Sequence, residues 1–278
     1  MPTPAKFPLP DPASIAAEAP LLFFDSGIGG LSVLKAVQAE LPKAPIVYVA
    51  DFAGLPYGNK TEIQITARVA GLLGRLVERY RPRLVTIACN TASTIALNEV
   101  RAAIDVPIVC TGPAIKPASE QTKTGVIGLL GTAATVRQRY VDQLETEFAS
   151  NMTLLRHAAP ELVHAAEAKM RGEAVDPQIY ADAMRGLTSQ ARGDRLDVVV
   201  LGCTHFPLVQ EELLTAVPGM GFVDGAAGIA RRIAHLTDAQ VWPIEPLAGT
   251  FVTTGPLTEA EPLQPALSSF GLSNILSL

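Results

Sequence analysis

Two cysteines at the ends of predicted strands carry the most evident chemistry in this chain. Cys89 lies in "VTIACNTAS" (85–93) and Cys203 in "VVVLGCTHF" (198–206), and in both stretches a β-rich run leads to a small residue, the cysteine and a nearby threonine. Polar groups directly after a buried strand need hydrogen-bonding partners, which a ligand could supply. The ordinary alternative is that each cysteine is a small buried hydrophobe, which is the better interpretation for Cys110.

A pair of thiols on opposite sides of a pocket suits one reaction in particular. One thiolate removes a proton from a carbon and the other thiol delivers a proton to the opposite face, so that the centre is inverted. An unperturbed thiol has a pKa of about 8.5 and is only a few per cent ionised at pH 7. Lowering that pKa to about 7 requires roughly 2 kcal/mol, and helix N-termini could supply part of it. Disulfide exchange has no support here, and a metal would need more ligands than one spare histidine.

A glycine-rich turn follows the first buried run. The stretch "FFDSGIGGLSV" (23–33) predicts a strand, a tight turn and the start of a helix, with Asp25 and Ser26 at the turn. The carboxyl ends of parallel strands open onto a ligand crevice, where helix N-termini favour anions. The glycines do not fit the dinucleotide-binding fingerprint. A carboxylate raises a nearby thiol pKa, so we expect Asp25 to handle a substrate ammonium or to shuttle a proton.

Apolar runs alternate with amphipathic segments from Leu21 onward, which predicts a βαβ chain with mainly parallel sheets. The runs are "LLFFD", "IVYVAD", "LVTIACN", "IVCTG", "GVIGLLGT", "MTLLRH" and "DVVVLGC". The likeness of 85–93 to 198–206, with a looser match of "FFDSG" (23–27) to "LLGTA" (129–133), indicates two related halves. We therefore expect an α/β protein of two pseudo-symmetric domains with the active site in the cleft between them.

Helix-capping patterns mark the scaffold. Thr61 and Gln64 predict a capping box before a long amphipathic helix. Asp176 followed by Pro177 predicts the start of another helix, and Gly193 its far end. Thr132 predicts the N-cap of the helix that begins "AATVRQRY".

Composition excludes several classes of function. The 278 residues carry a formal net charge of −5 and no basic cluster, which argues against nucleic acid and anionic membranes as partners. No apolar stretch approaches the roughly 20 residues that span a bilayer, and no signal peptide is evident. Three cysteines without metal-ligand or disulfide-framework spacing favour a cytoplasmic protein with free thiols and no metal site. Residues 1–20 carry six prolines and predict a loose arm.

Five motifs together resemble the glutamate racemases, a family of the aspartate/glutamate racemase superfamily. The motifs are "DSGIGGLSV" (25–33), "PYGNK" (56–60), "ACNTAS" (88–93), "GLLGTAATV" (128–136) and "LGCTHFPL" (201–208), and they span most of the chain in the family's order. The resemblance implies a racemase that interconverts L- and D-glutamate without a cofactor and supplies D-glutamate for peptidoglycan.

The same resemblance assigns residues to roles. Cys89 would take the proton from D-glutamate and Cys203 from L-glutamate, with Asp25 assisting the first and His205 the second. Glu167 stands where the family places an acid before the last third of the chain, and is carried over as a catalytic residue. The residues implied to line the substrate are Ser26, Pro56, Tyr57, Gly58, Asn90, Thr91, Thr132 and Thr204. In the alternative interpretations His205 is structural, Thr132 is only a helix cap and "PYG" is only a turn.

Departures from the family pattern fall around Glu167 and residue 225. In "AAPELVHAAEAKMRG" (158–172), Ala159 replaces a cysteine and His164 a second proline. Gly225 stands where a serine is common, and we expect activity to survive that change.

The family's chain crosses into the second half and returns. We therefore expect a first domain of residues 21–112 and 225–278, a second domain of residues 113–224, and "GTFVTTG" (249–255) as the returning edge strand. Family members commonly form dimers, so a homodimer is compatible with the resemblance, but the sequence leaves oligomeric state open. Two other functions stay open: a superfamily racemase for aspartate, a hydantoin or a related acid, and a binding protein that has lost turnover.

Overall fold

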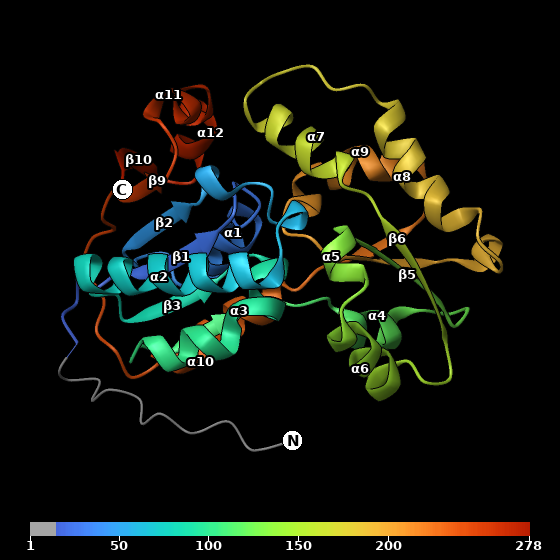
Figure 1. The fold of residues 1–278 in the computed structure, drawn as a ribbon, viewed down its shortest axis with the longest axis horizontal. Coiled ribbons are helices and arrows are strands. Elements are labelled where there is room, and N and C mark those ends of the chain that lie inside the picture. Colours follow the sequence, from blue (N-terminus) through green and yellow to red (C-terminus); the bar gives the residue numbers. More distant parts are fainter. Residues whose placement is uncertain (1–14) are drawn as a thin grey trace.

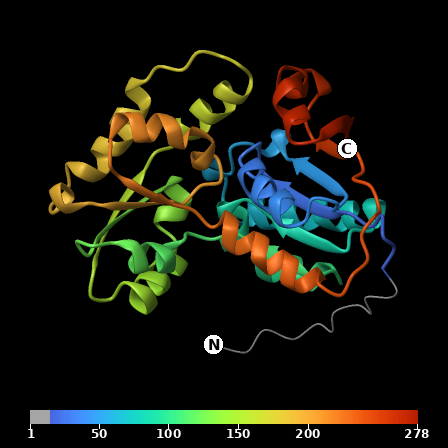
Figure 2. The ribbon, with the colours of Figure 1, turned by 180° about the vertical axis from the view of Figure 1, so that it is seen from behind.

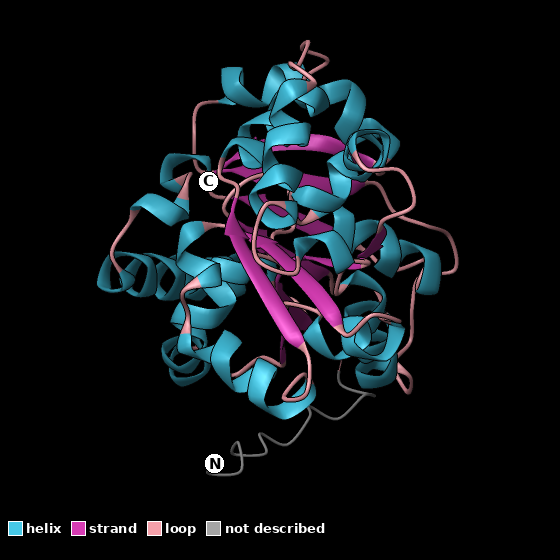
Figure 3. Ribbon diagram, turned by 90° about the vertical axis from the view of Figure 1, so that its right-hand side faces the viewer, coloured by secondary structure: helices cyan, strands magenta, loops and turns pink. Residues whose placement is uncertain are grey.

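The computed structural model describes residues 15–278, in which two parallel β-sheets lie next to each other and helices cover both faces of each (Figure 1). The side view shows the strands enclosed by helices (Figure 3). The expected α/β class, with parallel sheets in a two-domain arrangement, is confirmed. Most of the proline-rich arm, residues 1–14, lies outside the described residues. No helix among residues 15–278 is long and apolar enough to cross a membrane.

The larger sheet contains six strands of the described chain in the order β10-β9-β2-β1-β3-β4, all paired in parallel. They are β1 (Leu21–Asp25), β2 (Ile46–Ala50), β3 (Leu84–Ile87), β4 (Ile108–Cys110), β9 (Gly249–Thr253) and β10 (Leu272–Ser277). Successive side chains of a strand point to opposite faces. Leu21 and Phe23 therefore pack into one apolar cluster and Leu22 and Phe24 into another, which explains why β1 is apolar throughout.

Helices cover both faces of the larger sheet. They are α1 (Leu31–Glu40), α2 (Glu62–Tyr80), α3 (Asn90–Ala103), α10 (Ala226–Thr237), α11 (Leu257–Ala260) and α12 (Gln264–Ser269), with short 3₁₀ turns η2 (Phe52–Gly54), η3 (Tyr57–Asn59) and η6 (Glu261–Leu263). Helices α1 and α10 lie together on one face of the sheet (Figure 2), and α2 and α3 pack on the other face. Helix α2 begins at the predicted capping box, in which the Thr61 side chain accepts from the Gln64 backbone N–H.

The smaller sheet has the order β6-β5-β7-β8 among the described residues and is also parallel. Its strands are β5 (Val126–Gly131), β6 (Thr153–Ala158), β7 (Val198–Leu201) and β8 (Gly221–Val223). Its helices are α4 (Ile115–Gln121), α5 (Ala133–Val136), α6 (Arg139–Phe148), α7 (Glu161–Met170), α8 (Gln178–Thr188) and α9 (Gln210–Ala216), with 3₁₀ turns η4 (Gly193–Arg195) and η5 (Phe206–Val209). Helices α7, α8 and α9 cover one face, and α4 and α6 the other.

The strands of the larger sheet come from both ends of the chain and those of the smaller sheet from its middle. Helix α10 packs on α1, and β9 pairs with β2, so the chain after residue 225 returns to the first sheet. The exact domain boundaries at residues 112 and 224 stay a prediction.

Two local expectations are wrong. The returning strand β9 is internal, because β10 pairs with its outer side and forms the edge instead. Helix α8 ends at Thr188 rather than at Gly193. At Gly193 the chain folds back so closely on the Thr188 carbonyl that a Cβ would collide with it, so this glycine serves a close approach and not a helix end.

Candidate active site

The first side of the site, here called the Cys89 wall, consists of Asp25, Ser26 and Cys89. Strands β1 and β3 are neighbours in the larger sheet, so the residues that follow their carboxyl ends lie side by side. Ser26 Oγ lies 3.2 Å from Asp25 Oδ1 and 3.7 Å from Cys89 Sγ. Cys89 is also the residue that precedes α3, at the positive end of the helix dipole.

The second side, the Cys203 wall, consists of Cys203, His205 and Glu167. Cys203 follows β7 at the same offset at which Cys89 follows β3. Cys203 Sγ lies 3.8 Å from His205 Nδ1, and His205 Nε2 lies 3.1 Å from Glu167 Oε1. A thiol, an imidazole and a carboxylate therefore form a continuous line, which is a geometry suited to moving a proton at the sulfur.

Hydrogen bonds join each wall, or the residues next to it, to the opposite half of the molecule. Thr204 Oγ1 donates to Asp25 Oδ2 at 3.0 Å, and the Ile28 backbone N–H donates to Glu167 Oε1 at 3.1 Å. Asn90 Nδ2 donates to the Gly202 carbonyl at 2.6 Å. Each half thus supplies a donor to the carboxylate of the other, and the sequence alone gave no sign of these pairings.

The glycine-rich turn is explained by this close contact. A Cβ on Gly27 would lie 2.5 Å from Glu167 Oε1, and one on Gly29 would lie 2.7 Å from both the His205 backbone nitrogen and Thr204 Oγ1. Side chains at these positions would push the two walls apart. The glycines of "DSGIGG" therefore let the β1–α1 turn fit against the second half, which is a more specific role than a flexible turn.

Burial controls the charge state of the Cys89 wall. Complete burial raises the pKa of Asp25 above its ordinary value, and the field of His205 and three hydrogen bonds offset this only in part. Burial, with the negative charge of Asp25, raises the pKa of Cys89 to about 12. The helix N-terminus considered in the sequence argument is therefore outweighed, and Cys89 is held as a protonated thiol.

The Cys203 wall has the opposite charge preference. Burial by itself would lower the pKa of His205, but the contacts with Cys203 and Glu167 outweigh it and hold the pKa well above the ordinary value. For Glu167, burial opposes ionisation, but the hydrogen bond from His205 and further donors lower the pKa of the carboxyl below its usual range. An imidazolium beside a carboxylate is therefore the stable state of this wall.

The other residues expected to line the substrate lie around the same junction. Asn90 and Thr204 take part in the bonds between the walls, and the Asn90 Oδ1 atom is buried without a partner. Thr91 Oγ1 of the first half lies 3.3 Å from Thr132 Oγ1 of the second. Thr132 also caps α5, because its side chain accepts from the Thr135 N–H. The residue is therefore a helix cap and also faces Thr91 of the first half.

The "PYG" segment approaches the cleft from the first half. A Cβ on Gly58 would lie 3.8 Å from that of Thr132, so this loop faces the second half. The Tyr57 hydroxyl, however, donates to Asp51 Oδ2 at 2.6 Å and the residue is 2% exposed. The Tyr57 hydroxyl proton is therefore already donated to the buried Asp51 carboxylate. A direct hydrogen bond from this hydroxyl to the substrate stays a prediction. Pro56 directly precedes the 3₁₀ turn η3.

Two charged residues near the site were missed by the sequence reasoning. Asp51 is fully buried, and its carboxylate accepts from Arg68 Nη2 at 2.6 Å as well as from Tyr57. Its place directly after β2 is the same signal that singled out Asp25. Arg171 donates to Glu167 Oε2 at 3.0 Å, and its spacing of four residues from Glu167 on a helix was an available signal for this ion pair. Its contact with the Glu259 carbonyl had no such signal, because only the folded chain brings these two residues together.

The family departures are accommodated locally. Ala159 is buried in the apolar core beneath α7, where a small side chain fits, and His164 lies on the exposed side of that helix. A Cβ on Gly225 would approach the Gly112 carbonyl at 3.3 Å. Glu167 nevertheless lies at the junction of the two halves, where its carboxylate contacts His205 and accepts from the Ile28 N–H.

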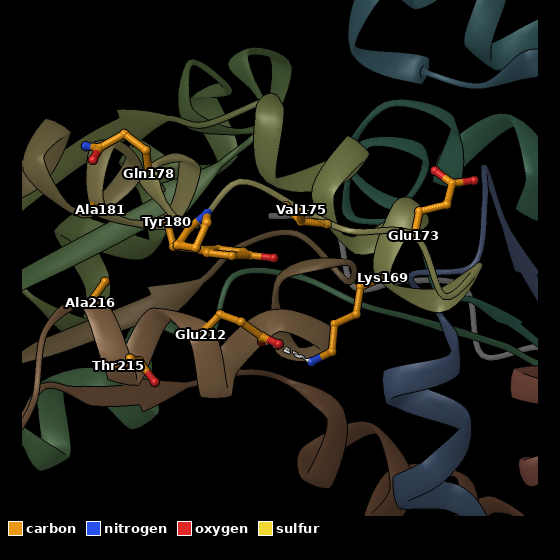
Figure 4. A pocket seen from close by; sticks show the side chains of 10 residues that line it. Lys169, Glu173, Val175, Gln178, Tyr180, Ala181, Glu212, Thr215 and Ala216 are labelled. Carbon is orange, nitrogen blue, oxygen red and sulfur yellow. Dashed lines mark hydrogen bonds and ion pairs between the residues drawn. The ribbon is translucent and has the colours of Figure 1, made fainter.

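A separate pocket lies on the second half between α7, α8 and α9 (Figure 4). The Tyr180 hydroxyl points into it, and the ion pair of Lys169 and Glu212 lies at its side. None of its lining residues belongs to either wall of the cleft.

A family model described as Asp/Glu/Hydantoin racemase matches residues 31–233, a range that contains both cysteines and Glu167. The chain belongs to this racemase family. The expectation of a racemase enzyme and the resemblance to the glutamate racemases are thereby confirmed.

Curated relatives within the racemase family match nearly the full chain. The glutamate racemase of Sphingopyxis alaskensis is 60% identical over 261 residues, which cover 94% of this chain and 97% of the relative. A glutamate racemase of Haemophilus influenzae is 45% identical over 219 residues, covering 78% of this chain and 80% of the relative.

Solved racemase structures share the fold. The Escherichia coli glutamate racemase, in complex with L-glutamate and the activator UDP-MurNAc-Ala, superposes with a TM-score of 0.86 at 39% identity and covers 94% of this chain and 98% of that one. The glutamate racemase isoform RacE1 of Bacillus anthracis, at 24% identity and a TM-score of 0.79, covers 94% of this chain and 97% of that one and supports the fold alone. The roles of the individual residues stay predictions.

Proposed function

We propose that this protein interconverts L- and D-glutamate by moving a proton at Cα between two thiols, Cys89 and Cys203, without a cofactor. The observation that carries the proposal is the pairing of two buried thiols, each two residues after a strand of a different sheet, in walls that bond to one another. A cysteine that only filled space would not need an acid or an imidazole beside it.

The proton moves in one direction as follows. The Cys203 thiolate takes the Cα proton of L-glutamate, and the electron pair stays on the carbon, where the adjacent carboxylate carries the developing charge. The Cys89 thiol then gives its proton to the opposite face, which yields D-glutamate and a Cys89 thiolate. Transfer of protons through solvent restores the starting state, and the reverse reaction exchanges the two roles.

The neighbours of each thiol support these roles. A protonated His205 lies 3.8 Å from Cys203 Sγ, so a thiolate formed there faces a positive charge, and Glu167 holds the imidazole in place. Cys89 is kept protonated by burial beside Asp25, which suits the acid of this direction. Asp25 relays the proton when Cys89 has to act as the base.

Polar groups without strong internal partners are suited to bind the substrate. The buried Asn90 Oδ1 can accept from the substrate ammonium, and the hydroxyls of Thr91 and Thr132 can donate to a carboxylate. The start of α5 adds backbone N–H groups near Thr132.

The bacterial origin of the glutamate racemases to which this chain is similar supports a role in supplying D-glutamate for peptidoglycan in the cytoplasm. The E. coli racemase structure holds L-glutamate, which favours glutamate over the other acids named by the family. A homodimer is compatible with this function but is not needed for the two-walled site.

Proton NMR in deuterated water tests the proposal. The protein should replace the Cα hydrogen of both L- and D-glutamate with deuterium during racemisation, because each turnover delivers a solvent-derived proton. Cys110→Ala is the matched control and should retain activity, since Cys110 lies on β4 and outside both walls. Racemisation of L-aspartate or a hydantoin in preference to glutamate would move the protein to the alternative substrates. Undiminished racemisation by both Cys89→Ser and Cys203→Ser would exclude the two-thiol mechanism.

A further inference from the structure

Arg171, directly after α7, connects the two halves of the molecule at the edge of the cleft. Its Nη2 donates to Glu167 Oε2 at 3.0 Å, within the second half. Its Nη1 donates to the Glu259 carbonyl of α11 at 2.8 Å, and its guanidinium lies 5.7 Å from the centre of the Phe52 ring. Both of the latter groups belong to the segments around the larger sheet. One planar guanidinium thus binds a carboxylate on one side and the opposite half on the other.

These contacts extend the Cys203 wall across the cleft. Glu167 Oε2 accepts from Arg171, while Glu167 Oε1 accepts from the Ile28 N–H and contacts His205, which contacts Cys203. Two groups that hold the Glu167 carboxylate therefore depend on the first half being in place. One is the Ile28 N–H, and the other is Arg171, which is bonded to the Glu259 carbonyl.

Substrate entry requires these contacts to break. Cys89 is 6% and Cys203 is 7% exposed, so a dicarboxylate reaches the sulfur atoms only when the halves separate. Separation removes the Ile28 N–H from Glu167 and draws the Glu259 carbonyl away from Arg171. Closure restores both.

We propose that Arg171 is a positioning residue that couples closure of the cleft to the alignment of Glu167 and His205 with Cys203. In the open protein Glu167 keeps its contacts with His205 and Arg171 but loses the Ile28 N–H, and Arg171 loses the Glu259 carbonyl, so the carboxylate beside the imidazole is held less firmly. In the closed protein the guanidinium fastens the first half and holds the carboxylate at the same time, so the base forms around enclosed substrate and away from bulk water. This inference rests on the proposed function for its catalytic consequence.

A second ion pair on the same helix shows what is specific to Arg171. Lys169 of α7 pairs with Glu212 of α9 and also donates to the Leu208 carbonyl, so all of its bonds stay within the second half (Figure 4). Removing Lys169 costs α7 an ion pair, which is more exposed than that of Arg171, without touching the contacts between the halves. Lys169→Gln is therefore the matched control.

The pH dependence provides a readout that a merely structural arginine would not affect. The titratable or charged groups that influence Glu167 are His205 after β7 and Arg171 after its own helix, and Glu167 in turn acts on Tyr48 of β2. The positive charge of Arg171 is among the causes that lower the pKa of Glu167. In Arg171→Gln the carboxyl protonates more readily, so the acid-side limb of the kcat/KM profile should move to higher pH.

Hydrogen exchange at Ile28 provides a readout that needs no turnover. The Ile28 N–H is bonded to Glu167 across the cleft, so its exchange rate reports how often that contact opens. In full-length Arg171→Gln we expect exchange about tenfold faster and kcat about tenfold lower, the change for one charge-assisted hydrogen bond. Lys169→Gln should keep the wild-type exchange rate at the Ile28 N–H and the wild-type acid-side limb of the kcat/KM profile.

The conservative variant separates charge from geometry. Arg171→Lys restores the positive charge beside Glu167, so the acid limb should return close to its wild-type position. A single ammonium does not span both partners, so Ile28 exchange should remain faster than in the wild type. Wild-type Ile28 exchange in both Arg171 variants, or an unmoved acid limb in Arg171→Gln, would overturn the inference. If the wild type does not racemise glutamate, the proposed function fails, while the exchange comparison still decides whether Arg171 fastens the cleft.

Discussion

The Cys89 wall and the Cys203 wall share a backbone plan but differ in charge. Each thiol stands two residues after a parallel strand, and each wall contains a buried carboxylate that accepts a hydrogen bond from the other half. Beside Cys89 the carboxylate is Asp25, which favours a protonated thiol. Beside Cys203 an imidazole stands between the sulfur and Glu167, which places positive charge next to the thiol.

Under the proposed function, this difference would mean that a reaction between mirror-image molecules does not require a mirror-image site. Two enantiomers have equal free energy, so the equilibrium constant is one and kcat/KM must be equal in the two directions whatever the charges of the walls. What each direction requires is one base and one acid, on opposite faces. Under the proposed mechanism, a protonated Cys89 and an imidazolium beside Cys203 would meet that requirement for one direction, and the other direction would need proton relay through Asp25.

Removing one thiol at a time would break the comparison most severely. Cys89→Ala and Cys203→Ala should each lower racemisation by about 10³-fold or more, because either direction needs both groups. The residual chemistry should differ, since Cys203→Ala retains only the base for D-glutamate and Cys89→Ala only the base for L-glutamate. Incubation of each pure enantiomer in deuterated water, followed by NMR of the Cα hydrogen, measures this. Exchange of the same enantiomer by both variants would contradict the assigned faces.

A side chain on the glycine turn would push the walls apart without altering either thiol. Gly29→Ala places a Cβ against His205 and Thr204, so we expect kcat/KM about 10²-fold lower from misplacement of the Cys203 wall. Gly71→Ala is the matched control, because a Cβ there, on helix α2, meets nothing within 4 Å. That control should keep full activity and gain about 0.5–1 kcal/mol of stability, since alanine suits a helix better than glycine. Steady-state assays with thermal unfolding of both variants test this, and equal activities would refute the tight-approach argument.

Asp25→Asn would test the charge of the Cys89 wall through the pH dependence of thermal stability. Because burial raises the pKa of Asp25, the folded protein binds this proton more tightly than the unfolded chain, and stability falls as pH rises through the raised pKa. At pH 8 the uncharged variant should therefore unfold about 2–4 °C above the wild type, even though its racemase activity is lost. The difference should vanish below about pH 3.9, where the carboxyl is protonated in both states. Melting curves across this range measure the effect, and a pH-independent difference would count against it.

The smallest expected effect separates scaffold from site. Thr61→Ala removes the capping box of α2, far in sequence from either thiol, and should cost about 1 kcal/mol of unfolding free energy with unchanged kcat. Thr132→Ala removes a similar cap, on α5, but also the hydroxyl that faces Thr91 across the cleft. It should therefore raise KM for glutamate as well as lower stability. Denaturant unfolding with steady-state kinetics of the two variants would show whether only Thr132 carries both roles, and equal KM values would make it a cap alone.

Local patterns were sufficient for most of the secondary structure. The seven apolar runs correspond to β1 through β7, and the capping signals of Thr61 and Thr132 are present in the structure, because strand burial and helix capping depend on residues close in sequence. The helix at 178 begins one residue after Pro177, where the Asp176 side chain accepts from the Gln178 N–H. The expectation failed where distant segments decide the outcome. Strand β10, which comes later in the chain, covers the outer side of β9. The early end of α8 is a local failure instead, because the chain at Gly193 folds back on the Thr188 carbonyl at the end of that helix.

The sequence by itself determined the alternation of strands and helices and placed a thiol, with polar neighbours, directly after a buried strand in each half. These features depend on short-range periodicity, so each of them is contained within a single short segment of the chain. Only the tertiary structure decided the charge of the site, because burial and contacts between distant residues set it. They raise the pKa of Cys89, align Glu167 with His205, and bring Arg171 to bind both halves at the edge of the cleft.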